Sequence, residues 1–238
     1  MKIIQWTGKS RLNWKPYEKA TAEQKYEKAY EIAEAHLKSA QSSKESEEWV
    51  RALVRCVQTR MGLHGYESAV RFLKEQPWPE DLLAQTTLHL YYAQALLTYA
   101  HGYSWEIQRR EKVESKGTVD LKAWTVEQIF AEARRSYEVV FSHRDQLGGQ
   151  PVAMLSEYIQ LGSYPREIRP TLRDAVTYFY AGALADTLGW APGQPEEVYT
   201  LDLGALLAEK PSLQADHPVA KYCEVLGDLE SWHTERKE

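Results

Sequence analysis

The segment from Leu82 to Trp105 decides the fold class of this chain. It reads LLAQTTLHLYYAQALLTYAHGYSW, which is 24 residues without Asp, Glu, Lys or Arg, and a helix of this length could cross a bilayer. Its hydrophobicity is diluted by Gln85, Thr86, Thr87, His89, Gln94, Thr98 and His101, and such residues make membrane insertion unfavourable. We therefore predict a central helix of a folded domain and no membrane span. We expect this helix to start near Glu80 and to run past Trp105 into Arg109-Arg110-Glu111-Lys112.

Helical periodicity extends from this segment towards the N-terminus. Residues 1–14 are expected to form a tail or extended arm, helical structure begins near Pro16, and Thr21-Ala22-Glu23-Gln24 matches a capping box. The expected breaks are Ser42-Ser43, Gly62 and Gly65, and Pro77-Trp78-Pro79, with a short helix from Tyr66 to Gln76. The apolar residues at helical spacing are Tyr26, Ala29, Tyr30, Ala33 and Leu37, then Trp49, Ala52, Leu53, Cys56 and Val57.

The same pattern extends towards the C-terminus. Gly117-Thr118 interrupts the chain, and Thr125-Val126-Glu127-Gln128 predicts a second capping box. The inward positions expected after it are Ile129, Phe130, Ala133, Tyr137, Val140 and Phe141; Leu172, Ala175, Val176, Phe179, Ala183 and Leu184; and Val219, Tyr222, Cys223 and Leu226. The expected connections are Gly148 to Pro151, a short helical stretch over 154–159, the loop Gly162-Ser163-Tyr164-Pro165, and Gly189 to Pro195.

Strand-like alternation is nearly absent, so we predict an all-α fold with one helical domain over residues 15–238. Tyr26-Glu27-Lys28-Ala29 recurs 40 residues later as Tyr66-Glu67-Ser68-Ala69, which is one helical-hairpin period in repeat proteins of the tetratricopeptide class. A chance recurrence of a common helical tetrapeptide explains the match equally well. The expected architecture is a stack of helical hairpins, either a tetratricopeptide-like solenoid or an irregular helical bundle.

Composition excludes a disordered or collagen-like chain. The chain has 238 residues, 43% of them hydrophobic and 26% charged, with a formal net charge of −5. These values are typical of a folded domain and give no support for a nucleic-acid partner. The two cysteines, Cys56 and Cys223, lie among apolar residues of expected helices, which predicts buried thiols; a disulfide or a reactive thiol is the alternative.

No local motif for catalysis, metal or cofactor binding is present. The sequence lacks His-Glu-x-x-His, close cysteine pairs, a phosphate-binding glycine loop and Gly-x-Ser-x-Gly. The acid pairs Glu47-Glu48 and Glu196-Glu197 occur where helices are expected to begin, where carboxylates complement the helix dipole. We therefore expect neither an enzyme nor a metal or cofactor site. An enzyme whose catalytic residues are scattered along the chain is the alternative.

The candidate binding residues lie on and around the uncharged helix. Thr87, Tyr91, Gln94, Thr98 and His101 are spaced to form one polar stripe, which predicts either a groove that binds a peptide or partner helix, or a hydrogen-bonded seam between packed helices. The chain also has 8 Trp and 15 Tyr, residue types that are enriched at protein interfaces. Trp78, between two prolines, and Trp105, near Arg109 and Arg110, are the candidate exposed anchors, with core packing as the alternative.

Several segments carry a family resemblance. They are WVRALVR (49–55), GLHGYESAVRFLKEQPWP (62–79), YAHGYSWEI (99–107), VDLKAWT (119–125) and YPREIR (164–169). Together they resemble the helical N-terminal region of large bacterial alpha-2-macroglobulin-like proteins, over roughly residues 20 to 210. The resemblance implies a cell-envelope protein that entraps proteases through bait cleavage, with an internal thioester in some members.

The chain departs from that family in its chemistry. The Cys-x-Glu-Gln thioester motif is replaced by Cys223-Glu224-Val225-Leu226, and the sequence contains no run of β-sandwich domains and no export signal. The resemblance therefore implies a leading, non-catalytic helical module, with no functional residue of the family carried over. Its partner would be a protein, a peptide or other domains of a larger parent protein. The location would be periplasmic if the resemblance holds and cytoplasmic if the chain is complete, where a stand-alone peptide-binding scaffold is the alternative.

Overall fold

The computed structural model describes residues 6–110, 119–162, 165, 167–201, 213–214 and 216–236. The all-α prediction is confirmed, because these residues form helices and no strand, apart from an isolated bridge between Pro151 and Thr171. The α-helices are α1 Lys15–Ala22, α2 Tyr26–Ser43, α3 Ser46–His64, α4 Tyr66–Glu75, α5 Leu82–Gly102, α6 Ser104–Ile107, α7 Val126–Phe141, α8 Arg144–Leu147, α9 Leu172–Ala185, α10 Gln194–Tyr199 and α12 Pro218–Arg236. Short 3-10 helices, η1 and η2, span Val152–Leu155 and Thr187–Gly189.

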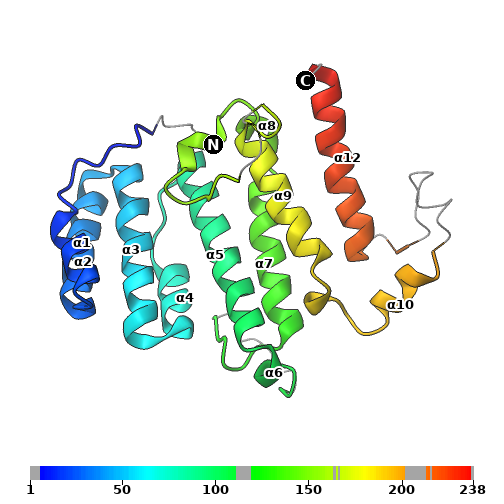
Figure 1. Cartoon of the computed structure of the whole chain (residues 1–238), viewed down its shortest axis with the longest axis horizontal. Helices are drawn as coiled ribbons and strands as arrows, with labels where there is room; N and C mark the ends of the chain where they lie inside the picture. Colours follow the sequence, from blue (N-terminus) through cyan, green and yellow to red (C-terminus); the bar gives the residue numbers. More distant parts are fainter. Residues whose placement is uncertain are drawn as a thin grey trace.

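The long helices stand side by side in chain order, as Figure 1 shows from α2 at one end to α12 at the other. Helix α2 packs on α3, α5 on α7, α7 on α9 and α9 on α12. Buried apolar side chains of the described residues form one continuous cluster from Trp6 to Val225. Gly189 shows how closely the layers approach, since a Cβ there would lie 2.1 Å from Cδ1 of Phe130. The fold is therefore a stack in which each helix is stabilised mainly by its neighbours.

Two of the expected helix starts behave differently. The capping box at Thr125 is confirmed, because its hydroxyl accepts from the Gln128 amide and the Gln128 side chain accepts from the Thr125 amide. The box at Thr21 is wrong. Thr21 belongs to α1, where its hydroxyl donates to the carbonyls of Tyr17 and Glu18, and α2 starts only at Tyr26. A threonine inside a helix satisfies its own hydroxyl in this way, which the spacing alone does not reveal.

Several helix ends also differ from expectation. Helix α5 ends at Gly102 and does not continue past Trp105, because Tyr103 leaves the helical backbone before the short helix α6. Gly62 lies inside α3, where a Cβ would lie 3.8 Å from the ring of Tyr26, and Gly65, with φ of 82°, ends that helix. Helix α7 ends at Phe141, before Gly148. Of the stretch expected to be helical over 154–159, only Met154 and Leu155 lie in a helix, the short η1, and residues 156–159 form turns and a bend.

The predicted inner face of the last helix is only partly right, because Tyr222 packs against the core while Val219 and Leu226 are half-buried. Helix α12 buries Val225 and Leu229, whereas Cys223 is exposed. The helix is rotated because Asp228 faces α8 and α9, where Arg144 and Arg173 bind its carboxylate. Cys56 is buried as predicted, and burial raises the pKa of its thiol to about 12, which makes it unreactive. Both cysteines are free thiols.

The expected interruption at Gly117-Thr118 lies outside the described residues, as do Ser163 and Tyr164 of the expected loop and residues 1–5 of the expected tail. The described part of that tail is an arm that lies against α3, with Trp6 and Trp14 buried. No helix in the described ranges is both long enough and apolar enough to span a membrane.

Candidate functional site

The polar stripe of α5 passes from the core to the surface. Thr87 is 2% exposed and donates its hydroxyl to the carbonyl of Leu83 at 2.8 Å. Tyr91 is half-buried; burial raises the pKa of its phenol to about 12, and a side-chain hydrogen bond with Gln58 of α3 opposes this rise. The seam interpretation therefore describes this half of the stripe, because its polar groups are satisfied between packed helices.

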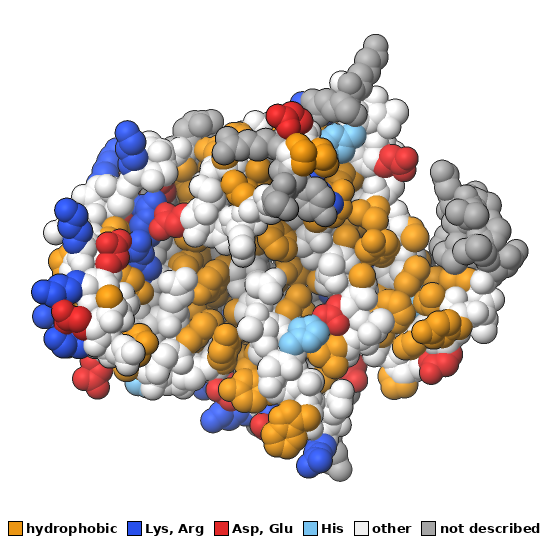
Figure 2. Space-filling view, viewed as in Figure 1, with side chains coloured by type: hydrophobic (Ala, Val, Ile, Leu, Met, Phe, Trp, Pro, Cys, Tyr) orange, Lys and Arg blue, Asp and Glu red, His pale blue; other side chains and the backbone are white. Residues whose placement is uncertain are grey.

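The other half of the stripe lies on the surface. Gln94, Thr98 and His101 are exposed. Thr98 donates its hydroxyl to the carbonyl of Gln94 at 2.8 Å, and Nε2 of His101 lies 2.6 Å from Oδ2 of Asp186, just beyond α9. The groove hypothesis is limited to these three residues. In Figure 2, charged side chains gather over α1 and α2, whereas the surface over α5 and α7 is mostly uncharged.

The two candidate tryptophan anchors have different environments. The indole of Trp78 is half-buried, donates to the carbonyl of Leu73 at 2.8 Å and packs edge-on against the ring of His89 at 5.0 Å. Trp78 thus belongs to the core packing. Trp105 is 65% exposed on α6, with the guanidinium of Arg109 5.7 Å from its ring centre.

Between α5 and α6, one exposed aromatic residue was missed by the sequence reasoning. Tyr103 is 41% exposed, and its ring lies 4.8 Å from that of Tyr99. The signal available for it was its position after Gly102, where a helix exit turns the next side chain outward. We define the α5–α6 surface as Gln94, Thr98, His101, Tyr103 and Trp105. It offers amide and hydroxyl groups for hydrogen bonds next to two aromatic rings, a combination typical of protein contacts.

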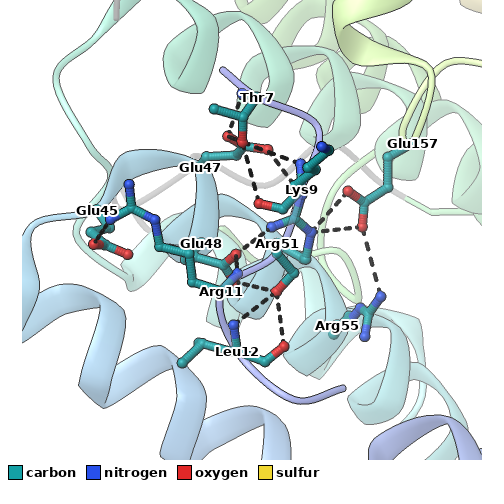
Figure 3. Close-up of polar contacts among 11 residues, drawn as sticks. Thr7, Lys9, Arg11, Leu12, Glu45, Glu47, Glu48, Arg51, Arg55 and Glu157 are labelled. Atoms are coloured by element: carbon teal, nitrogen blue, oxygen red, sulfur yellow. Dashed lines mark hydrogen bonds and ion pairs between the residues drawn. The ribbon is translucent and has the colours of Figure 1, made fainter. Parts of the chain in front are cut away.

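A charged cluster joins the N-terminal arm to α3 (Figure 3). Arg51, whose side chain is 4% exposed, donates to Glu47, Glu48 and Glu157 at 3.1, 2.7 and 2.9 Å. The backbone amides of Thr7 and Arg11 donate to Glu47 and Glu48, each at 2.8 Å. Since these contacts occupy the carboxylates of Glu47 and Glu48, the cluster holds the N-terminal arm against α3.

A second buried acid lies at the opposite end of the stack. Asp174, 1% exposed, accepts from the amide and hydroxyl of Thr171 at 2.9 and 2.7 Å, in a capping box that starts α9. Its other oxygen lies 2.7 Å from Nε2 of His233 on α12. The histidine–aspartate contact thus fixes α12 on α9. Within the described ranges, no three His, Cys, Asp or Glu residues are grouped so as to hold a metal ion.

Comparisons with known proteins identify no relative. No protein-family model, no curated protein and no solved structure matches the chain.

Proposed function

We propose that the chain is a non-catalytic helical protein-interaction module whose partner contacts the α5–α6 surface. The observation that supports this proposal most strongly is Trp105, which is 65% exposed beside Tyr103 and Arg109. Trp, Tyr and Arg are the residues that most often dominate binding free energy at protein interfaces.

We propose further that this module is the leading helical part of an alpha-2-macroglobulin-like cell-envelope protein. The resemblance over residues 20 to 210 supports this assignment, and the stacked helices are compatible with it. A stand-alone, tetratricopeptide-like cytoplasmic scaffold is the alternative. The reading frame after codon 238 tests the choice, because β-rich macroglobulin domains there support the first assignment and an immediate stop codon supports the second.

The interaction surface is tested by binding of variants. The immobilised chain captures partners from an extract of its own cells, mass spectrometry identifies them, and one purified partner is then titrated. We expect Trp105→Ala to weaken binding at least 10-fold and Gln94→Leu to weaken it less. Tyr26→Ala is the control, because Tyr26 is a 39% exposed aromatic residue on α2, which contributes neither to the α5–α6 surface nor to the lining of a neighbouring cavity. Unchanged affinity of both surface variants, with normal helicity, would reject the proposed surface.

A further inference from the structure

A cavity of about 400 Å³ opens next to the α5–α6 surface. It lies between α6, the start of α7 and the loop that leads to α10. Asp186 connects the cavity to the α5–α6 surface. Its Oδ2 contacts His101 of that surface, and its Oδ1 accepts from the amide of Leu188. Leu188 and Ile107 both line the cavity. A partner bound over Trp105 would therefore reach the cavity entrance.

The cavity has an ordered aromatic wall. Trp190 lines it and donates its indole N–H to the carbonyl of Leu184 at 2.8 Å. The ring of His217 packs edge-on against the indole at 5.5 Å. These two contacts fix the plane of the Trp190 ring before any partner binds. A fixed indole plane next to aliphatic side chains is suited to a long side chain with a flat or cationic end.

The charge at the cavity is negative. Glu127, in the first turn of α7, and Glu196, in the first turn of α10, both line it. Both side chains are exposed, and neither carboxylate has a hydrogen bond or ion pair within the described part of the chain. Two carboxylates that line one cavity give it a negative potential, which favours binding of a cation.

Among the described lining residues, Arg110 carries the positive charge, and it does not cancel the two carboxylates. The guanidinium of Arg110 also lines the cavity, but it donates to the carbonyls of Leu121 and Trp124 and forms an ion pair with Glu106 at 2.9 Å. The positive end of α7 amounts to about half a charge, and the Thr125 hydroxyl already accepts from one of its amides. Counted over the described residues, a net negative charge therefore remains at the entrance.

We infer that this cavity binds a basic side chain, arginine in particular, from a partner segment that contacts the α5–α6 surface. The guanidinium would stack on the Trp190 ring and donate to the carboxylates of Glu127 and Glu196. Arginine fits better than lysine because its planar group can stack and donate at the same time. The inference rests on the proposed function and adds the chemistry of the partner to it.

Short peptides test the inference on the full chain without the natural partner. The probes are acetyl-Gly-Gly-Arg-Gly-Gly-amide and its Ala and Glu analogues, titrated against ¹⁵N-labelled protein while the indole N–H signals are recorded. The Trp190 signal is assigned with Trp190→Phe. We expect only the Arg peptide to shift the Trp190 signal in a saturable way. Equal shifts with all three peptides, or no shift of Trp190, would overturn the inference.

A charge-matched pair of variants separates the cavity from net charge. Glu127→Gln/Glu196→Gln should weaken binding of the Arg peptide at least 5-fold. Glu27→Gln/Glu31→Gln changes two exposed acids on α2, alters net charge equally, and should leave binding unchanged. Equal weakening in both pairs would mean non-specific attraction and would reject the cavity. If the Arg peptide does not bind but Trp105→Ala still weakens binding of the partner, only this inference fails. A peptide that binds, with a partner indifferent to Trp105, would reject only the proposed function.

Discussion

Arg51 on α3 and Arg173 on α9 occupy matching roles near opposite ends of the stack, yet their surroundings differ. Each side chain is 4% exposed. Arg51 binds Glu47 and Glu48 of its own helix and Glu157 from the segment after η1. Arg173 binds only remote acids, Asp145 on α8 and Asp228 on α12, and its guanidinium lies 4.8 Å from the ring centre of Trp232.

The partners of the two arginines differ most in their contact with water. The Glu48 side chain is 4% exposed, whereas that of Asp145 is 82% exposed. A buried carboxylate that loses its partner cannot be solvated, but an exposed one can. The N-terminal carboxylates therefore depend on Arg51 for their solvation. In the C-terminal cluster, water can partly replace the contacts of Arg173.

Arg51→Met should have the largest effect and tests this difference directly. It leaves Glu48 buried without its guanidinium, although the Ser10 hydroxyl and Arg11 amide still donate to it. We expect a loss of about 3–5 kcal/mol in the free energy of unfolding, measured by urea denaturation at pH 7.5. Glu48→Gln/Arg51→Met should recover part of this loss, because the most deeply buried of the three carboxylates is then neutral. A loss for Arg51→Met no larger than for Arg173→Met would remove the distinction between the two ends.

The stability of variants at the two ends should be compared above pH 7. Below that pH, His89 on α5 makes the free energy of unfolding depend on pH. Burial, followed by the charges of Lys74 and His143, lowers the pKa of His89 from 6.5 to about 4. The folded state therefore binds fewer protons than the unfolded state between pH 6.5 and 4, and stability falls as the pH falls through this window. The shift corresponds to up to about 3 kcal/mol.

Urea titrations at pH 7.5, 6, 5 and 4.5 check this expectation. His89→Gln should flatten the slope of stability against pH in that window. Burial lowers the pKa of His36 as well. His36→Gln is therefore measured in parallel, so that the contribution of His36 to the pH dependence of stability is known. An unchanged slope in His89→Gln would show that other groups cause the acid sensitivity.

The sequence predicts local features of this fold well and long-range ones poorly. The capping box at Thr125 and the glycine exit at Gly65 involve neighbouring residues only, and both are as expected. The face of α12 is predicted only in part, because apolar spacing allows two rotations, and the choice depends on Asp228 meeting Arg144 and Arg173, which are 84 and 55 residues away. Glu47 and Glu48 have the spacing of helical ion pairs with Arg51, but their burial depends on the arm.

The candidate site follows the same division. The stripe on α5 could be read from spacing, but its division into a buried and an exposed half could not, because α3 covers only one end. Trp78 and Trp105 have similar sequence neighbourhoods near breaks, yet only Trp105 is exposed. The acids of the cavity come from α7 and α10, which only the folded chain brings together.

Asp228→Asn should produce an intermediate effect and sharpen the picture of the C-terminal cluster. Burial tends to raise the pKa of Asp228, but hydrogen bonds from Arg144 and Arg173 outweigh it, and the pKa is lowered. Arg173 keeps its contacts with Asp145 and Trp232 in the variant, so we expect a loss of about 1–2 kcal/mol. Native-state hydrogen exchange should show the loss mainly in α12. Equal loss of protection in α2 and α3 would mean that the stack unfolds as one unit.

Glu45→Gln should have the smallest effect, although it removes a contact at the better-buried end. Glu45 pairs with Arg11 at 2.6 Å, but their side chains are 37% and 77% exposed, and exposed pairs contribute about 0–1 kcal/mol. The arm is held instead by the Thr7 and Arg11 amides on Glu47 and Glu48. We therefore expect a change below about 0.5 kcal/mol in urea denaturation. A loss of stability approaching that of Arg51→Met would mean that the exposed Glu45–Arg11 pair holds the arm. It would contradict the view that burial of Glu48 makes this end of the stack depend on Arg51.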